Sequence, residues 1–211
     1  MPYLILGIIL SYLIGSIPPA YLLGRLWKRI DIRKAGSGNI GATNALRVLG
    51  KKAGITILIL DILKGIIPVI FLGDFIIARL ASMSGEAIRI ILGISCICGH
   101  NWTIFLRFKG GKGIATSLGV LLGLSLRIPG LNLVLGLVIG IWLIVLIISR
   151  IVSLASLLAG ISLPIFMLVF RLSSVLVWAS LVLCVMMVLR HRPNIKRLLQ
   201  GKEPRIDFKK H

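Results

Sequence analysis

The sequence predicts an all-α integral membrane protein with seven transmembrane helices, and three observations lead to this fold class. Hydrophobic residues make up 57% of the 211 residues and charged residues only 15%, and the mean hydropathy is +1.03. A soluble domain of this length cannot bury so much apolar surface, so lipid must surround most of it. Apolar runs of about 20 residues, the length that crosses a bilayer, recur along the chain. The basic residues that produce a net charge of +19 lie between those runs.

Seven apolar segments are the candidate spans. The first is followed directly by a basic run, so we expect it to be a retained membrane helix and not a cleaved signal peptide. The fourth is short and rich in glycine. Short connections predict antiparallel neighbours, and no soluble domain or internal repeat is evident, so we expect one membrane-embedded domain over 1–211. The expected spans are residues 3–24, 53–72, 86–106, 113–127, 130–149, 151–170 and 174–190.

The distribution of Lys and Arg orients these spans. Alternate connections hold most of the basic residues, whereas the opposite side has only four arginines. The basic connections are residues 25–52, 107–112, 149–152 and 190–211. Because cytosolic loops carry the positive excess, we expect the N-terminus outside and the C-terminus in the cytosol.

The excess of 25 Lys and Arg over six Asp and Glu restricts the partners. Such a charge suits nucleic acid or small anions. Because the basic residues lie between membrane spans, we expect contact with the lipid bilayer and with anionic substrates, and no nucleic acid. The three cysteines, Cys96, Cys98 and Cys184, lie in apolar segments and are expected to be buried thiols, so no metal site is predicted.

The stretch KAGSGNIGATNALRVLG begins with a glycine loop over residues 36–41, the first glycine loop. Gly36, Gly38 and Gly41 have the G-x-G-x-x-G spacing of dinucleotide-binding proteins. That fold needs a preceding strand and an acid about 20 residues further on. Here a basic run precedes, and the next acid, Asp61, lies inside an expected span. We therefore expect no dinucleotide, but the glycines still let backbone N–H groups approach an anion.

A short helix that Gly50 ends is expected after this loop. Asn39, Thr43 and Arg47 are spaced at four residues and form one polar line. On another face lies an apolar stripe of Ala42, Ala45, Leu46 and Leu49. The pattern predicts an interfacial helix that lies on lipid and turns Arg47 inward, and an ordinary connector along the membrane surface is the alternative.

The stretch RFKGGKGIATSLG contains a second glycine loop, residues 110–113. It resembles a nucleotide-binding P-loop, but that motif requires glycine at 106 and Ser or Thr at 113, where this chain has Leu106 and Gly113. What remains is a glycine turn at the N-terminus of the fourth span, with Lys112 beside it. Backbone N–H groups and the helix dipole favour an anion there. A lysine that reaches to the membrane surface is the alternative interpretation.

The third stretch, HRPNIKRLLQGKEPR, follows the last span. His191 and Asn194 are three residues apart across Pro193, which can start a short helix that Gly201 ends. A histidine at this depth can act as a base, a phosphate donor or a surface residue. In SRIVSLAS, Ser156 lies near the cytosolic end of the sixth span, where serine commonly serves helix packing.

Two further polar features lie within the spans. Asp61 and Lys64 are one turn apart and can neutralise each other, with a proton route as the alternative. His100 lies late in the third span, either to orient the second glycine loop or as a satisfied interfacial histidine.

Taken together, the three stretches resemble the three signature motifs of the PlsY family of bacterial membrane acyltransferases. The resemblance is carried by GSGNIGATNALRVLGKKAG, GHNWTIFLRFKGGKGIATSLG and HRPNIKRLLQGKEPR, and it extends over essentially the whole chain. It implies transfer of a fatty acyl group from acyl-phosphate to glycerol 3-phosphate, which gives lysophosphatidic acid in the first acylation of phospholipid synthesis. It also implies no cofactor, a partner enzyme PlsX that supplies the acyl-phosphate, and a site at the cytosolic face of the bacterial cell membrane.

The resemblance also implies which residues act. The catalytic set is Ser37, Arg47, Lys112, His191 and Asn194. The expected substrate-binding set is Gly36, Gly38, Asn39, Gly41, Thr43, Asn44, Gly110, Gly111, Gly113 and Ser156. The chain departs from the family pattern at two positions: Thr103 replaces a frequent proline, and Ile151 replaces a frequent aromatic residue before VSLAS.

The general base is left open between His191 and the phosphate of the donor. The H-x-x-x-x-D motif of acyl-CoA-dependent enzymes is missing, because Phe105 and Lys196 stand at the fifth positions after His100 and His191. A small transporter of phosphorylated or anionic solutes is the alternative function. Transporters place their binding groups near the membrane midplane, whereas most polar motifs here are expected at one surface.

Overall fold

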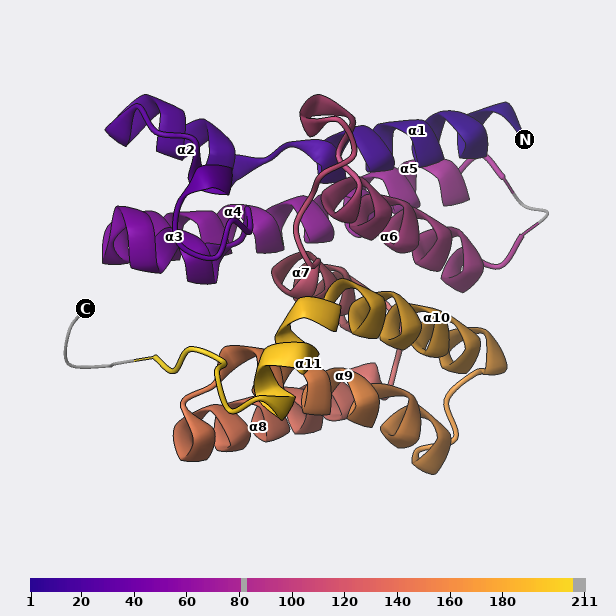
Figure 1. Ribbon diagram of the computed structural model, residues 1–211. Coiled ribbons are helices and arrows are strands. Elements are labelled where there is room, and N and C mark those ends of the chain that lie inside the picture. Colours follow the sequence, from indigo (N-terminus) through magenta and orange to yellow (C-terminus); the bar gives the residue numbers. More distant parts are fainter. Residues whose placement is uncertain (81–82, 207–211) are drawn as a thin grey trace. The chain divides into compact units, whose positions relative to one another are not determined.

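Helices account for all the regular structure in the described part of this chain. The computed structural model describes residues 1–80 and 83–206, which contain eleven α-helices and no strand (Figure 1). Residues 81–82, in an expected outer connection, and 207–211, at the end of the basic tail, lie outside the described residues. The prediction of an all-α protein is confirmed.

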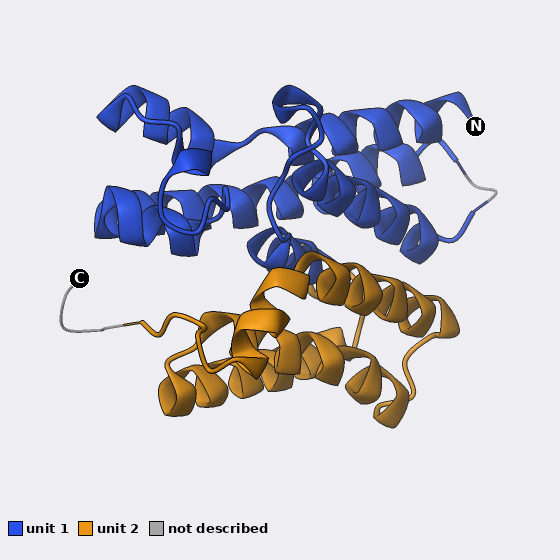
Figure 2. Ribbon diagram, in the orientation of Figure 1, with its two compact units in different colours: residues 1–124 blue, residues 125–211 orange. Residues whose placement is uncertain are grey.

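The chain forms two compact units, residues 1–124 and 125–211 (Figure 2). The prediction of one domain over the whole chain stays a prediction. The helices of unit 1 are α1 (Pro2–Ser16), α2 (Pro19–Lys28), α3 (Ala42–Leu49), α4 (Lys51–Ile67), α5 (Gly73–Ile77), α6 (Gly85–Asn101) and α7 (Ile114–Ser125, at the boundary), with the short turns η1 (Ile32–Lys34), η2 (Pro68–Leu72) and η3 (Ile104–Leu106). Unit 2 contains α8 (Leu131–Ser149), α9 (Val152–Val169), α10 (Ser174–Arg190) and α11 (Arg192–Leu199).

The number of spans differs from the expected seven. Five helical runs are long and apolar enough to cross a membrane among the described residues, or six if α10 and α11, bent by 62°, count as one. The expected span 113–127 corresponds to α7, which has only 12 residues. A helix of that length rises about 18 Å, whereas the hydrocarbon core is about 30 Å thick. The count of seven is therefore not confirmed, and the orientation of the chain stays a prediction.

Small residues bring α1 and α6 into close contact. A Cβ atom added to Gly15 would lie 2.0 Å from the Cys96 carbonyl oxygen, and one added to Gly99 would lie 2.1 Å from the Tyr12 carbonyl oxygen. The Ser11 hydroxyl, one turn before Gly15 on α1, donates to the Leu92 carbonyl of α6. Such small residues are typical of helix pairs in lipid, where close backbone approach replaces the hydrophobic driving force.

The first span of the sequence is broken at two adjacent prolines. α1 ends at Ser16 and α2 begins at Pro19, because Pro18 and Pro19 have no N–H to continue the helix. Thr103 supports this break by donating its hydroxyl hydrogen to the Ser16 carbonyl. Its φ of −67° is also the angle that proline imposes, so the departure from the family pattern at Thr103 keeps the same local backbone.

Within unit 2, α9 packs against both α8 and α10. A Cβ atom on Gly160 of α9 would lie 2.5 Å from Cε of Met187 on α10, so the two helices approach closely at that level. The chain then turns from α10 into α11 at His191, with Pro193 in the first turn of the new helix. This corner carries the third motif.

Candidate active site

Asn44 holds the first glycine loop in shape. Its side chain is 1% exposed, and its Oδ1 accepts the Ser37 backbone N–H at 2.8 Å. The amide nitrogen faces three loop carbonyls, those of Asn39 at 2.9 Å, Ala35 at 3.1 Å and Ile32 at 3.3 Å. Asn44 was expected to bind substrate, but its contacts are with the loop backbone, so its hydrogen bonds support a positioning role.

The glycines of this loop are required by space and by backbone angle. Gly36 has a φ of +59°, and a Cβ atom there would lie 2.3 Å from Asn44 Oδ1. Gly38 has a φ of +72°, which side chains rarely allow. The loop therefore wraps closely around the Asn44 amide and leaves Ser37 exposed on its outside.

Part of the apolar stripe of α3 packs into the protein, and the position of this helix on the membrane surface stays a prediction. Ala45 is 0% exposed and Leu49 is 8% exposed, in a buried cluster with Ile32 and Ile40. Amphipathic spacing alone does not say whether the apolar side meets lipid or protein. Leu106, four residues before the second glycine loop, belongs to the same cluster, so one hydrophobic cluster of unit 1 contacts the segments that carry both loops.

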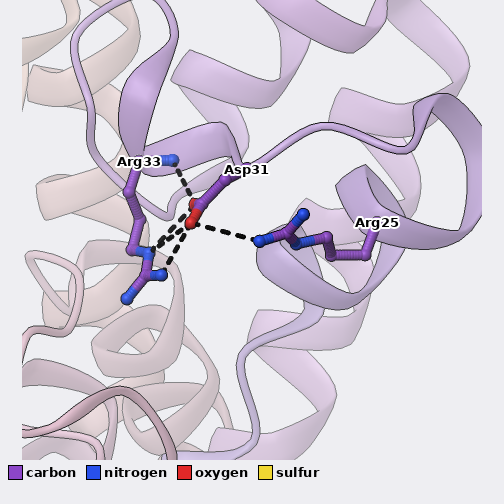
Figure 3. A network of polar contacts seen from close by, with 3 residues as sticks. All are labelled: Arg25, Asp31 and Arg33. Carbon is purple, nitrogen blue, oxygen red and sulfur yellow. Dashed lines mark hydrogen bonds and ion pairs between the residues drawn. The ribbon is translucent and has the colours of Figure 1, made fainter.

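An ion-pair network anchors the segment that enters the first glycine loop (Figure 3). The Asp31 carboxylate accepts from the Arg33 side chain at 2.6 Å and lies 3.6 Å from the Arg25 guanidinium. The Arg33 hydrogen bond lowers the pKa of Asp31 to about 2, so the carboxylate is ionised under all ordinary conditions. Sequence reasoning missed this role of Asp31. The charges of Arg25 and Arg33 are thus partly neutralised within the protein.

We expect Asn44→Asp to disrupt this loop although the two side chains have nearly the same shape. The change places a carboxylate oxygen against three carbonyl groups in place of an amide donor, so the loop loses about 2–4 kcal/mol of hydrogen bonding. Thermal unfolding in detergent and catalytic turnover measure the effect. Thr56→Val, which removes only a local hydrogen bond within α4, is the control. Native stability and turnover in the Asn44→Asp protein would contradict the assignment.

The second glycine loop is packed against the end of α6. The Gly111 N–H donates to the His100 carbonyl at 3.0 Å, and a Cβ atom on Gly110 would lie 2.1 Å from that same oxygen. A Cβ atom on Gly111 would lie 2.2 Å from His100 Nε2. Gly113 has a φ of +81°, and a Cβ atom there would lie 2.7 Å from Asn101 Oδ1. No other residue fits these positions without displacing the loop.

Lys112 lies between these glycines and directly before α7. Lys112 is half-buried, and α7 begins two residues later. In the first turn of α7, the Ser117 N–H donates to the Gly113 carbonyl at 2.7 Å. The structure therefore places Lys112 at a helix N-terminus, as the sequence predicted. Backbone N–H groups, the helix dipole and an ammonium group all favour an anion at this position.

Glu203 organises the third motif in unit 2. Its Oε1 accepts from Asn194 Nδ2 at 2.5 Å and from the Ser153 hydroxyl at 2.7 Å, and its Oε2 accepts from Arg197 Nε at 2.7 Å. Burial raises the pKa of Glu203, but these three hydrogen bonds outweigh that effect and leave the pKa below its usual value. The residue lies outside the predicted site set. The signal in the sequence that could have identified Glu203 is its acidic side chain, because the chain has only six Asp and Glu residues.

The contacts of Asn194 and His191 fix which atoms they offer to a ligand. Because a carboxylate only accepts, the Asn194 amide nitrogen must face Glu203, and its oxygen turns away. Asn194 is 4% exposed, and this oxygen has no hydrogen-bond partner within residues 1–80 and 83–206. His191 Nδ1 lies 2.9 Å from the Met187 carbonyl, so Nδ1 carries a hydrogen, and Nε2 is the nitrogen that can act as a base when the ring is neutral.

Ser156 on α9 contacts a tryptophan of the neighbouring helix. Its hydroxyl oxygen accepts from Trp142 Nε1 at 3.2 Å, and the serine is 3% exposed. Since the indole N–H is donor-only, the Ser156 hydroxyl hydrogen points elsewhere and can be donated to an oxygen of a ligand. Ile151, the second departure from the family pattern, is the residue before α9 and has an extended backbone.

The structure thus gathers the predicted residues in groups. In unit 1, Asn39, Gly41, Thr43 and Arg47 lie on the first glycine loop or on α3, and Lys112 lies on the second loop. In unit 2, His191 and Asn194 lie at the corner between α10 and α11. The substrate contacts of all these residues stay predictions.

The sequence and the fold match known proteins over nearly their full length. Residues 5–201 match the family model described as Glycerol-3-phosphate acyltransferase. Glycerol-3-phosphate acyltransferases of Thermoanaerobacter pseudethanolicus and Prochlorococcus marinus strain MIT 9211 are each 44% identical, over 207 and 210 residues. These alignments cover 98% of this chain and 98% and 95% of the two relatives.

Two crystal structures are also similar. PlsY (YgiH), an integral membrane glycerol 3-phosphate acyltransferase, in its glycerol 3-phosphate form gives a TM-score of 0.86 at 35% identity, covering 98% of this chain and 97% of that one. The lysophosphatidic acid form gives a TM-score of 0.82 at 35% identity, covering 97% and 95%.

Proposed function

This chain belongs to the glycerol-3-phosphate acyltransferase family, and from that premise we propose that it transfers a fatty acyl group from an acyl-phosphate to glycerol 3-phosphate. The product is lysophosphatidic acid. The similar PlsY structures have a glycerol 3-phosphate form and a lysophosphatidic acid form, which are acceptor and product of the same reaction. The enzyme is a multi-pass membrane protein, and we assign its site to the cytosolic face of the bacterial cell membrane, with PlsX as the supplier of the donor.

Repulsion between two anions is the main obstacle to this reaction. Both substrates carry phosphate, and the attacking hydroxyl must come within roughly 3 Å of the acyl carbon. Lys112, Arg47 and the N–H groups of the two glycine loops are the cationic and polar groups that offset this repulsion. Each charge-assisted hydrogen bond contributes about 1.5–3 kcal/mol.

The donor already carries a good leaving group, so no protein nucleophile is needed. The glycerol hydroxyl oxygen bonds to the acyl carbon, the bond from that carbon to the phosphate oxygen breaks, and phosphate leaves. We assign the hydroxyl proton to the departing phosphate. Asn194 Oδ1 is assigned to accept a hydrogen bond from glycerol 3-phosphate, and His191 to orient it.

The observation that carries the proposal is the second glycine loop, which presents Lys112 at the N-terminus of α7 and has no space for any side chain at Gly110 or Gly111. In the direct test, protein purified in detergent is incubated with palmitoyl-phosphate and glycerol 3-phosphate. Lysophosphatidic acid should form from palmitoyl-phosphate and not from palmitoyl-CoA. Product from palmitoyl-CoA alone would overturn the donor assignment, and solute uptake into liposomes without product would favour a transporter.

His191→Gln should leave the acid limb of the pH–rate profile in place while lowering kcat/KM about 10-fold. Glutamine keeps a polar group near the Nε2 position but cannot act as a base, so only orientation is weakened if the donor phosphate takes the proton. Initial rates between about pH 5 and pH 9 measure both quantities. Loss of the acid limb in the His191→Gln enzyme would instead make His191 the general base.

A further inference from the structure

Three ionisable side chains that are not among the residues assigned above form a buried cluster in unit 1. Asp61 and Lys64 lie on α4 and His100 lies on α6, with side chains that are 1%, 7% and 5% exposed. Lys64 Nζ is 2.9 Å from Asp61 Oδ1, and His100 Nδ1 is 3.6 Å from the same oxygen, close enough for electrostatic attraction but too long for a hydrogen bond. Ionisable groups inside a membrane protein are costly, so such a cluster needs a function or a structural reason.

Lys64 has a structural reason of its own. Its ammonium group also donates to the Ile17 carbonyl at 2.9 Å, next to the break between α1 and α2. The Cys96 thiol donates to the Lys64 carbonyl at 3.1 Å and ties α6 to α4. These contacts explain why a cation lies here. They do not explain why its carboxylate partner also faces a histidine.

His100 connects the cluster to the second glycine loop. Its backbone carbonyl accepts the Gly111 N–H, and its ring lies so close that a Cβ atom on Gly111 would be 2.2 Å from Nε2. The two ring nitrogens therefore face different partners: Nδ1 faces Asp61 and Nε2 faces the loop. Lys112 is the residue that follows Gly111.

The helix that carries Asp61 also packs against α7, which follows this loop. A Cβ atom on Gly119 of α7 would lie 2.0 Å from the Ile62 carbonyl of α4, and one on Gly65 would lie 2.3 Å from the Thr116 carbonyl. The loop thus runs between α6 and α7, and α4 packs against both helices. Because these helices are closely packed, a change in the tilt of the His100 ring would displace the loop and not the helices.

We propose that Asp61 and His100 are positioning residues for the anion site of the second glycine loop: Asp61 orients the imidazole through Nδ1, and the Nε2 edge of the ring sets the position of Gly111 and so of Lys112. The proposal rests on the proposed function, because it assumes that Lys112 binds a substrate phosphate. A carboxylate close to one ring nitrogen favours a hydrogen on that nitrogen and attracts that edge of the ring.

The alternative is an ion pair that only stabilises the helices, and the two roles predict different kinetics. Asparagine resembles histidine at the Nδ1 position and glutamine resembles it at the Nε2 position. His100→Asn therefore keeps the contact with Asp61 and loses the one with Gly111, whereas His100→Gln does the reverse. We expect kcat/KM to fall about 100-fold in the His100→Asn enzyme and only about 10-fold, as in Asp61→Asn, in the His100→Gln enzyme.

A double-mutant cycle tests the connection between the two residues. Asp61→Asn should lower kcat/KM about 10-fold in the native chain and raise the inhibition constant of inorganic phosphate by a similar factor. In the His100→Gln background the same change should have less than about a twofold effect, because glutamine no longer reaches Asp61. Equal effects in both backgrounds would overturn the proposal.

Controls separate this result from loss of folding and from failure of the proposed function. Asp61→Asn leaves Lys64 without its carboxylate, so Asp61→Asn with Lys64→Met, which removes both charges, is measured beside it. Asp74→Asn breaks the ion pair with Arg89 in the same unit and should leave kcat/KM unchanged. If Lys112→Ala lowers turnover while none of the Asp61 or His100 variants changes kcat/KM per folded enzyme, the positioning role fails alone. If Lys112→Ala is itself active, the anion site fails and the positioning role with it.

Discussion

Lys112→Ala is expected to lower kcat/KM at least about 100-fold while leaving the helices and thermal stability intact. Removing one preorganised donor from the place where charge must be stabilised costs about 100- to 1,000-fold in other enzymes. In the proposed site, the lost group is a full positive charge beside a substrate phosphate. The remaining backbone N–H groups at the start of α7 would still bind phosphate, but more weakly.

The same loop offers a matched control. Lys109 is exposed and lies three residues before Lys112, so Lys109→Ala removes an equal charge from the membrane surface without touching the glycine turn. Steady-state turnover of palmitoyl-phosphate in detergent, with circular dichroism to verify folding, measures both variants. Equal losses in the two would mean that only the net surface charge matters. Wild-type activity in the Lys112→Ala enzyme would remove Lys112 from the site.

Sequence patterns located the motifs well because glycines and prolines mark where helices begin and end. Gly50 ends α3, Pro193 lies in the first turn of α11, and Lys112 stands before α7 as expected. These features depend on local backbone conformation, which a few adjacent residues determine. The family resemblance then supplied the reaction, which no spacing of residues could give.

What the sequence missed depends on contacts between distant residues. Glu203 binds Ser153, which is 50 positions earlier, and its stretch has no periodic pattern that predicts this contact. Asparagine is a residue type that often binds ligands, but the Asn44 amide makes hydrogen bonds to the backbone of the loop that surrounds it. The apolar stripe of α3 predicts a helix that lies on lipid, but Ala45 and Leu49 are buried within the protein, because hydrophobic spacing is the same whether the neighbour is lipid or another helix.

The count of seven spans is not confirmed for a similar reason. Hydropathy over 113–127 is high enough for a membrane helix, but the helix covers only Ile114–Ser125. The glycine turn before it and the RIPG connection after it shorten it from both ends. Cβ atoms on Gly119 and Gly123 would meet Ile62 of α4 and Val69 of η2, which suits a short helix packed within the protein.

Glu203→Ala is expected to have the largest effect on stability. It removes the carboxylate that accepts hydrogen bonds from Asn194, Ser153 and Arg197. Three donors then lose this acceptor, and two of them belong to buried residues. Breaking a buried charged network costs about 3–5 kcal/mol, and the partial exposure of Arg197 lowers this to about 2–4 kcal/mol. Because Asn194 then loses the contact that turns its buried oxygen away from Glu203, kcat should fall about 10-fold or more per folded enzyme.

The pH dependence of stability gives an independent check on the same carboxylate. The pKa of Glu203 is lower in the folded protein than in the unfolded chain. The ionised carboxylate therefore stabilises the folded state above the pKa of the unfolded chain, about 4.3, and this stabilisation is lost as the pH falls through the pKa of the folded protein. The apparent Tm values of the native and Glu203→Ala proteins should therefore differ at about pH 7 and converge as the pH falls through the lowered pKa of Glu203. Arg205→Ala, an exposed change in the same tail, should follow the native curve throughout. A difference in Tm that persists undiminished at the acid end would show that the Glu203 contacts do not depend on its charge.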